Sequence, residues 1–192
     1  MTGNIRTKKA HLRSSILKKR RSMSDSECQR LSRIICERFL ESEEYRTAGS
    51  ILLYKAYNNE VDTDLIFEQA ISDGKTVAYP LSRIVDGEPD LTFHVIESQD
   101  QLSAGYKGIP EPSGVCQPFE KRADVCITPG AVFDRKCHRI GYGKAFYDRY
   151  LRLNSPGVVI GLAYELQIAD DFEPEESDRS MDMVITEINT FR

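Results

Sequence analysis

The chain has 192 residues, of which 40% are apolar and 29% charged, and its formal net charge is −4 at pH 7. This ordinary globular composition allows one sizeable core, so we expect a single domain over residues 1–192. It contains no apolar run of the roughly 20 residues that a membrane span needs, and its five cysteines lack a C-x-x-C pair, which favours free thiols in a reducing cytoplasm over disulfides or a zinc site.

Two helices are predicted at the start of the chain. Residues 5–22 place their few apolar side chains on one narrow stripe, with charged side chains around the rest of the helix. Ser24 and Glu27 form an S-x-x-E capping box, so a second helix is expected over residues 25–42, with an apolar face typical of a core helix.

The first of these helices is strongly basic. Residues 1–23 contain eight lysines and arginines and no acidic residue, which leaves the remainder of the chain strongly acidic. A basic arm on an acidic body suggests a polyanionic partner, which is either a nucleic acid, an acidic membrane surface or a small phosphorylated ligand.

The middle of the chain is predicted to alternate strands with helices, as judged from apolar runs and the polar turn residues between them. The predicted elements are a strand at residues 50–54, a loop at 58–60, a helix from Asp62 or Thr63 to Ser72, a C-cap at 73–75, a strand at 76–79 that Pro80 closes, a strand at 91–96 and an irregular loop at 100–122.

The last third continues the alternation, and several of its strands are apolar throughout. We expect a strand at residues 125–128, a helix at 144–153, a strand at 157–162, an acidic loop at 172–179 and a strand at 183–186. Continuous apolar strands separated by helices indicate an α/β fold with a mainly parallel sheet and helices on both of its faces.

The most informative segment is the one that follows the strand at 125–128. Gly141, Tyr142 and Gly143 lie between Arg139 and Lys144, just before a predicted helix. A strand, a glycine-bearing basic loop and a helix N-terminus together make a phosphate cradle, because free N–H groups and the positive end of the helix dipole face the anion. A lone G-x-G is also compatible with a simple surface turn, and the Walker A pattern is absent.

Two further groups of charged residues fit nucleotide chemistry. Lys9 and Arg13 are four residues apart, so they project from one helix face and are able to grip a triphosphate together. Asp148, with Asp178 or Asp182 from a separate loop, would supply hard oxygen ligands for Mg²⁺ at the sheet edge. Solvated surface charges and helix caps are the alternatives in each case.

Glu60 is a separate candidate. Its carboxylate follows two asparagines and precedes a predicted helix. It is suited either to bind the N–H groups of a heterocycle or to cap that helix.

Taken together, these segments resemble the 5-formyltetrahydrofolate cyclo-ligase family, whose members are also called methenyltetrahydrofolate synthetases. The likeness runs nearly end to end, and its most specific part is the central motif. It is carried by Lys9 to Arg13 with Arg21 to Ser24, by Asn59 to Thr63, by Thr128 to Gly130 with Phe133 and Asp134, by Arg139 to Asp148, and by Asp178 with Asp182.

The resemblance implies a single α/β domain similar to the sugar-phosphate isomerase and coenzyme A transferase group. It also implies ATP- and Mg²⁺-dependent conversion of 5-formyltetrahydrofolate to 5,10-methenyltetrahydrofolate, ADP and phosphate, through a phosphorylated formyl oxygen and ring closure by N10. We expect a monomer that needs neither a membrane nor a nucleic acid.

The same resemblance assigns site residues, which we group by role. Lys144 and Arg139 match catalytic positions, and Asp148 and Asp178 match metal-associated ones. The ATP-binding positions are Lys9, Arg13, Arg139, Ile140, Gly141, Tyr142, Gly143, Lys144, Ala145, Phe146 and Tyr147. The substrate-binding positions are Lys55, Glu60, Tyr142, Gly143, Lys144, Ala145 and Phe146.

Three positions depart from the family pattern. Ala145 and Phe146 stand where the family usually has Gly and then Tyr, and Ser177 stands where bacterial relatives often have His. An alanine with positive φ would cost about 1–2 kcal/mol, so we expect an ordinary helical φ at position 145. Phe146 keeps a stacking face without a hydroxyl, and Ser177 weakens the metal assignment of Asp178.

Two other functions compete with this interpretation. A sugar-phosphate isomerase or lactonase on a related fold would need a catalytic base beside a phosphate loop, and His94 and His138 lie outside any such motif. An RNA-binding protein that uses the basic arm would bind RNA with a steep salt dependence, whereas a catalytic helix would respond to ATP.

Overall fold

A computed structural model describes residues 2–170, 172–175 and 178–192. Within these residues a seven-stranded sheet organises the chain, with the strand order β12-β11-β9-β6-β1-β2-β3. The strands are β1 (Ser50–Leu52), β2 (Thr76–Val85), β3 (Glu88–Val95), β6 (Val125–Thr128), β9 (Val158–Leu162), β11 (Met183–Ile185) and β12 (Thr190–Phe191).

The sheet is mainly parallel, as predicted. Strands β2, β1, β6, β9 and β11 pair in parallel, and the antiparallel strands β3 and β12 close its two edges. Parallel strands are buried on both faces, which accounts for their continuous apolar runs.

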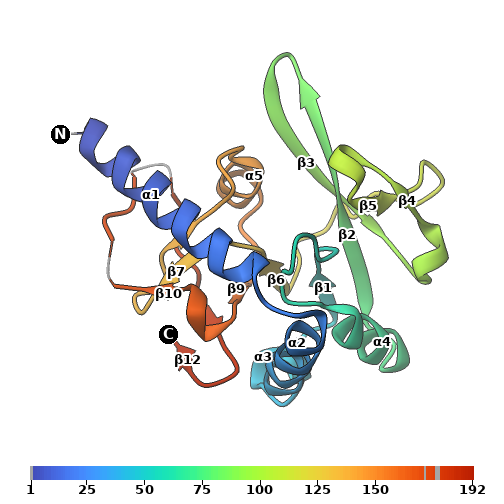
Figure 1. Ribbon diagram of the computed structural model, residues 1–192. Coiled ribbons are helices and arrows are strands. Elements are labelled where there is room, and N and C mark those ends of the chain that lie inside the picture. Colours follow the sequence, from blue (N-terminus) through green and yellow to red (C-terminus); the bar gives the residue numbers. More distant parts are fainter. Residues whose placement is uncertain (1, 171, 176–177) are drawn as a thin grey trace.

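Helices cover both faces of the sheet, which Figure 1 shows with α2, α3 and α4 on one side and α5 on the other. Ile35 and Phe39 share one core with Ile51, and Tyr150 shares the opposite core with Leu52. The two faces follow from the alternation of side chains along a strand. The helices are α1 (Thr2–Arg21), α2 (Asp25–Leu40), α3 (Glu43–Thr47), α4 (Asp64–Ser72) and α5 (Phe146–Asn154).

Two predicted helix starts are supported by side chains. The Ser24 hydroxyl accepts a hydrogen bond from the Glu27 N–H at the start of α2, which is the Ser24 half of the expected capping box. At α4 the N-cap is Thr63, but the Asp62 carboxylate accepts the Asp64 N–H at 2.9 Å.

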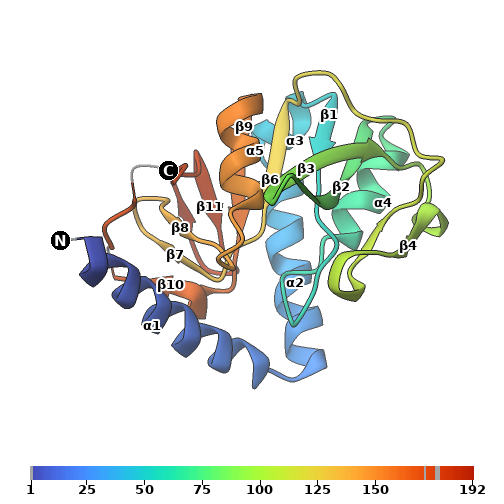
Figure 2. The same ribbon diagram turned by 90° about the horizontal axis from the view of Figure 1, so that it is seen from above.

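Helix α1 lies along a small second sheet instead of along the main one (Figure 2). Its apolar residue Ile16 packs in one cluster with Val132 and Ile140. That sheet has the order β10-β7-β8 and consists of β7 (Val132–Asp134), β8 (Arg139–Ile140) and β10 (Ile168–Ala169). Because β8 leads into the glycine-bearing loop, this packing brings the basic arm toward that loop.

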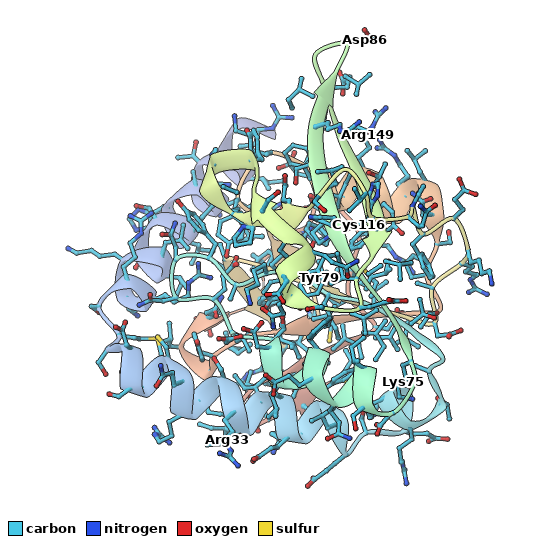
Figure 3. The ribbon with its side chains drawn as sticks, turned by 90° about the vertical axis from the view of Figure 1, so that its right-hand side faces the viewer. Arg33, Lys75, Tyr79, Asp86, Cys116 and Arg149 are labelled. Atoms are coloured by element: carbon cyan, nitrogen blue, oxygen red, sulfur yellow. The ribbon has the colours of Figure 1, made fainter. Side chains whose placement is uncertain are left out.

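The prediction that Pro80 closes its strand is wrong. Strand β2 continues to Val85, turns through Asp86 and Gly87, which both have positive φ, and forms a long hairpin with β3. Figure 3 shows Asp86 at the protruding tip. The residues facing β1 alternate along β2, and β1 ends at Leu52, so the missing N–H of Pro80 leaves no ladder partner unsatisfied.

The segment predicted as an irregular loop at 100–122 is partly ordered. It contains two 3₁₀ turns, η1 (Gln99–Gln101) and η2 (Tyr106–Gly108), and a two-stranded sheet of β4 (Leu102–Ala104) and β5 (Pro110–Pro112). The buried carboxylate of Glu111 accepts the N–H groups of Ser82 at 3.1 Å and Tyr106 at 3.0 Å, which ties the segment to β2. The ring of Tyr106 then lies 5.8 Å from that of Phe146 at the start of α5.

Within the described part of the chain, no helix combines the length and the apolarity that crossing a membrane requires.

Candidate active site

The glycine-bearing loop joins β8 to α5 and leaves the start of that helix open. Gly143 has a φ of +83°, and Lys144 is exposed. Helix α5 begins at Phe146, two residues later than predicted, and its N-cap residue makes no side-chain hydrogen bond to the helix. The N–H groups of the first turn therefore remain available to an anion.

The expectation of an ordinary helical φ at position 145 is wrong. Ala145 is the N-cap of α5 and adopts the left-handed conformation, with φ 54° and ψ 13°. Its Cβ makes this conformation unfavourable by about 1–2 kcal/mol. The turn from Gly143 into α5 requires the conformation, and the Arg149 N–H donates back to the Ala145 carbonyl at 2.9 Å.

The structure brings α1 beside this loop. A Cβ placed on Gly143 would lie 3.2 Å from Nη1 of Arg13, so the guanidinium rests directly against the loop backbone. A shared phosphate site requires this juxtaposition of two segments that are 130 residues apart in the sequence. In the described residues neither Arg13 nor Lys144 has an acidic partner, so both charges are available to a ligand.

Lys9, by contrast, is already paired. It is only 8% exposed, and its ammonium group forms an ion pair with the Asp178 carboxylate and lies 3.4 Å from Oε1 of Glu175. The acidic segment near the C-terminus therefore covers one of the two predicted phosphate ligands on α1.

Arg139 is buried beside the first turn of α5. One guanidinium nitrogen donates to Oδ1 of Asp148 at 2.5 Å and another to the Pro129 carbonyl at 3.1 Å. The ring of Tyr147 lies 5.9 Å from the guanidinium carbon. Nε of Arg139 and the hydroxyl of Tyr147 are both buried without a hydrogen-bond partner in the described structure, and burial raises the pKa of Tyr147 well above its usual value.

The two predicted metal ligands are each held by a cation. Asp148 uses Oδ1 for Arg139, and Asp178 uses Oδ2 for Lys9 and for the Glu175 N–H. Asp182 is structural, because Oδ2 accepts the Val159 N–H at 2.8 Å.

These residues do not form a complete metal cage. The described residues contain no group of three or more His, Cys, Asp or Glu side chains that is able to hold a metal ion. One or two carboxylates suit Mg²⁺ that takes its other ligands from phosphates and water. Ser177 lies outside the described residues.

Glu60 is held by two donors at the other side of the loop. The Tyr57 N–H donates to Oε2 at 2.9 Å, and the Tyr142 hydroxyl donates to Oε1. Burial raises the pKa of Glu60, while the hydrogen bond from Tyr142 and the charge of Arg20 oppose that rise. The alternative reading of Glu60 as the cap of the next helix is not supported, since Thr63 and Asp62 occupy that end.

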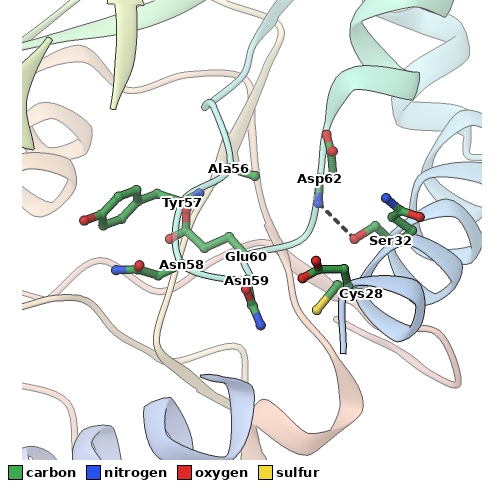
Figure 4. A pocket seen from close by; sticks show the side chains of 10 residues that line it. Cys28, Ser32, Ala56, Tyr57, Asn58, Asn59, Glu60 and Asp62 are labelled. Atoms are coloured by element: carbon green, nitrogen blue, oxygen red, sulfur yellow. Dashed lines mark hydrogen bonds between the residues drawn. The ribbon is translucent and has the colours of Figure 1, made fainter. Parts of the chain in front are cut away.

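A hollow of about 200 Å³ lies between α2 and the loop at 56–62 (Figure 4). Cys28 and Ser32 face it from α2, and the Glu60 carboxylate points away from them, toward Tyr57. Among the described residues no lysine or arginine lines this hollow, so it does not suit a triphosphate.

Lys55, a predicted substrate contact, is engaged within the protein. Its ammonium group lies 2.5 and 2.6 Å from the two carboxylate oxygens of Asp64 and 2.6 Å from Oε1 of Gln99. These three acceptors match the three N–H donors of a lysine.

Sequence reasoning missed Arg20 as a site residue, since it was one of eight basic residues in the arm. It is 1% exposed, the most deeply buried charged residue of α1, and it contacts Tyr142. The spacing in the sequence could have indicated it. Arg13 follows Lys9 by four residues and Arg20 follows Arg13 by seven, which places all three on one helix face.

Residues 5–187 match the sequence profile described as the 5-formyltetrahydrofolate cyclo-ligase family. The chain is 30% identical over 182 residues to a probable 5-formyltetrahydrofolate cyclo-ligase of Caenorhabditis elegans, which covers 88% of this chain and 87% of the relative. It is 23% identical over 199 residues to the 5-formyltetrahydrofolate cyclo-ligase of Mus musculus, with 95% of each chain covered.

Solved structures agree with the sequence matches. The 5,10-methenyltetrahydrofolate synthetase of Aquifex aeolicus superposes with a TM-score of 0.83 at 28% identity, covering 96% of this chain and 92% of that one. The 5,10-methenyltetrahydrofolate synthetase of Mycoplasma pneumoniae superposes with a TM-score of 0.72 at 27% identity, covering 93% and 98%. The wider likeness to sugar-phosphate isomerases and coenzyme A transferases stays a prediction.

Proposed function

The chain belongs to the 5-formyltetrahydrofolate cyclo-ligase family, and we propose that it closes 5-formyltetrahydrofolate to 5,10-methenyltetrahydrofolate with ATP and Mg²⁺ at the loop 141–145. The observation that carries the proposal for this site is the placement of Arg13 against Gly143. It puts a free cation from the N-terminal helix beside an uncapped helix N-terminus and the exposed Lys144.

The chemistry needs positioning more than it needs a protein nucleophile. The N5 formyl group is amide-like, and its oxygen is a poor leaving group. Transfer of the γ-phosphoryl group of ATP to that oxygen releases ADP and leaves an iminium phosphate. The N10 amine then attacks the formyl carbon, the ring closes, and phosphate departs with the oxygen. The protein must hold the reacting atoms in line and neutralise charge during the transfer.

Cations from both ends of the sequence share the phosphate-binding role in this proposal. Arg13, Lys144 and the N–H groups from Gly141 to Phe146 bind phosphate oxygens. Lys9 joins them by exchanging the carboxylates of Asp178 and Glu175 for phosphate. Such an exchange keeps a buried ammonium group paired throughout.

Asp148, with Asp178, would hold Mg²⁺, which would neutralise phosphate charge when bound. Arg139 donates a 2.5 Å hydrogen bond to Asp148. We therefore assign Arg139 the role of orienting this carboxylate. Both roles rest on the carboxylate oxygens that the cations leave free.

The folate side of the site is assigned to Glu60 and Phe146. Glu60 accepts N–H groups of the pterin, since its two donors leave a lone pair free on each oxygen. Phe146 offers a ring face beside Tyr106. A direct contact from Lys55 stays a prediction, and it requires release from Asp64.

Other features of the proposed enzyme are a single domain over residues 1–192, a monomeric state and a cytoplasmic location. Packing of α1 on β7 and β8 supports the single domain. All five cysteines are free thiols, which fits a reducing compartment.

The test is ADP formation and methenyltetrahydrofolate absorbance, each measured with and without 5-formyltetrahydrofolate. Lys9→Ala and Lys144→Ala should raise the KM for ATP about tenfold or more, since each removes a charged hydrogen bond to phosphate. Lys18→Ala is the matched control, because Lys18 is exposed on the same helix as Lys9.

Glu60→Gln should weaken folate binding more than ATP binding. Folate-independent ATP consumption, or no product at all, contradicts the proposed function.

A further inference from the structure

Arg20 is a buried cation in the last turn of α1 whose hydrogen bonds go to neutral oxygens. Nη1 donates to the Tyr142 hydroxyl at 2.8 Å and to the Gly130 carbonyl at 3.3 Å, and Nε donates to the Asn58 carbonyl at 3.2 Å. Its guanidinium carbon lies 5.6 Å from the centre of the Tyr142 ring. A buried charge that bonds only neutral groups needs a counter-charge nearby.

Glu60 supplies that counter-charge through Tyr142. The Tyr142 hydroxyl accepts from Arg20 and donates to Oε1 of Glu60, so one oxygen lies between the guanidinium and the carboxylate. Hydrogen bonds in such a chain polarise one another, because each donor becomes a stronger donor when its oxygen also accepts. Tyr142 as a residue stays 42% exposed while its hydroxyl makes these two hydrogen bonds.

The loop that contains Asn58 and Asn59 fixes Arg20, Tyr142 and Glu60 relative to one another. Asn58 and Asn59 both have positive φ, and the Asn59 amide donates to the carbonyls of Arg20 and Met23 at 3.2 Å each. The end of α1 and the Glu60 loop therefore hold each other. Gln167 fixes the shared Gly130 carbonyl at 2.9 Å from the other side.

We propose that Arg20 is a positioning residue: through the Tyr142 hydroxyl it keeps the half-buried Glu60 ionised and fixed in the orientation that accepts two N–H groups of the pterin. The proposal rests on the proposed function of Glu60 as the pterin acceptor. Arg20 touches no reacting atom in this scheme, and it acts by keeping another side chain charged.

Opposing influences set the protonation state of Glu60. Burial raises the pKa of Glu60, and the Tyr142 hydrogen bond and the Arg20 charge lower it. Desolvation raises the pKa values of Tyr54, Tyr142 and Tyr147 well above normal, and the nearby Glu60 charge adds to the rise, so these three phenols stay neutral in the working range of pH. Arg20 is thus the charge that offsets burial.

Removing the Arg20 charge should therefore shift the acid limb of kcat/KM for the folate. The carboxylate is the active form, and loss of a nearby cation raises its pKa, so activity declines from a higher pH and recovers in alkaline buffer. We expect Arg20→Met to move this limb up by about one pH unit and to raise the folate KM about tenfold. The KM for ATP should change little. Arg20→Lys keeps the charge and should leave the limb near its original position.

The deciding measurement uses no substrate. Protein labelled with ¹³C at the glutamate carboxyl carbon is titrated by NMR, and the Glu60 signal is assigned by its loss in Glu60→Gln. Arg20→Met should raise the Glu60 titration midpoint above that of wild type. Tyr142→Phe should do so too, because it removes the bridging hydroxyl but keeps the ring. Arg21→Met is the matched control, since Arg21 is the exposed neighbour on the same helix.

The outcomes separate the two proposals. An unchanged Glu60 midpoint in folded Tyr142→Phe or Arg20→Met protein overturns the role of Arg20, even if the enzyme turns over folate. Equal losses for both substrates with an unshifted pH profile would mean a structural role alone and also overturn it. A wild-type protein that forms no methenyltetrahydrofolate defeats the proposed function, while the titration still judges Arg20.

Discussion

Several residues of the candidate site adopt a left-handed backbone conformation that their side chains disfavour. Ala145 takes a left-handed conformation although it has a Cβ, and two adjacent asparagines do the same beside Glu60. Asparagine visits this region more readily than alanine does. Strain of this kind persists where the surrounding structure over-determines the backbone, and it concentrates at functional sites.

Relief of the strain at Ala145 should be measurable. Replacing Ala145 by Gly removes about 1–2 kcal/mol of left-handed strain but adds about 0.4–1 kcal/mol of unfolded-state entropy. We therefore expect a net gain of about 0.5–1 kcal/mol in the free energy of unfolding by denaturant titration. Ala10→Gly in α1 is the control, because Ala10 is exposed in a regular helix, where glycine should cost about 1 kcal/mol. A loss of stability at position 145 as large as that at position 10 would refute the left-handed assignment.

At the scale of elements, the site forms where α1, the loop before α5 and the loop after β1 meet. Each contributes one part of the site: α1 contributes Arg13, the loop before α5 contributes Gly143 and leads into an uncapped helix start, and the loop after β1 contributes Glu60. The long hairpin of β2 and β3 supports α5 from behind, with the rings of Phe93 and Tyr150 4.8 Å apart. The turn that we propose to bind phosphate is thereby attached to a packed scaffold.

Adding one methyl group at Gly143 should distinguish a role of the loop in ATP binding from the stability cost of an alanine with positive φ. Gly143→Ala imposes a Cβ at φ +83° and 3.2 Å from Arg13, so the loop and the guanidinium must move apart. We expect a stability loss of about 1–2 kcal/mol and a rise of about tenfold in the KM for ATP. Gly74→Ala is matched, since Gly74 has φ +71° with open space around it at the end of α4. It should lose similar stability with no change in the KM for ATP. An equal effect of both variants on the KM for ATP would contradict the proposal that the loop around Gly143 binds its phosphates.

At the scale of the whole molecule, the ligand is expected to tie the two ends of the chain together. In the described residues the N-terminal helix contacts the C-terminal acidic segment through Arg6 and Lys9. The Arg6 pair is exposed and contributes little to stability on its own, whereas the Lys9 pair is largely buried. ATP would replace part of this link with charged hydrogen bonds from α1, the loop and α5 to one triphosphate.

Binding of ATP and Mg²⁺ should therefore stabilise the fold and protect α1. At a hundred times the dissociation constant, the free energy of unfolding should rise by about 2.7 kcal/mol, which corresponds to roughly 5–10 °C in Tm. Hydrogen exchange of the α1 amides should slow, while that of α3, remote from the loop, should change little at short times. Lys9→Ala should reduce both effects. Protection confined to α5, with α1 unaffected, would show that the N-terminal helix does not bind the nucleotide.

Much of the fold was predictable because its signals are local. Apolar runs marked the parallel strands, Ser24 marked the start of α2, and the glycines beside Lys144 marked the turn before α5. Each depends on side chains a few residues apart. One local rule failed at Pro80. Proline interrupts a strand only where a neighbouring strand needs its missing N–H, and β1 has already ended at Leu52.

The amino-acid sequence by itself determined the α/β class, the family and the composition of the glycine-bearing loop, since hydrophobic pattern and glycine placement act over short distances. Only the tertiary structure decided that Ala145 is left-handed, that Lys9 is covered by Asp178 and that Arg20 is buried against Tyr142. The last two facts depend on contacts between segments that are far apart in the chain, and the first depends on the exact turn by which the chain enters α5. A buried cation and a solvated one look alike in a sequence, and it is the packing of α1 that distinguishes them.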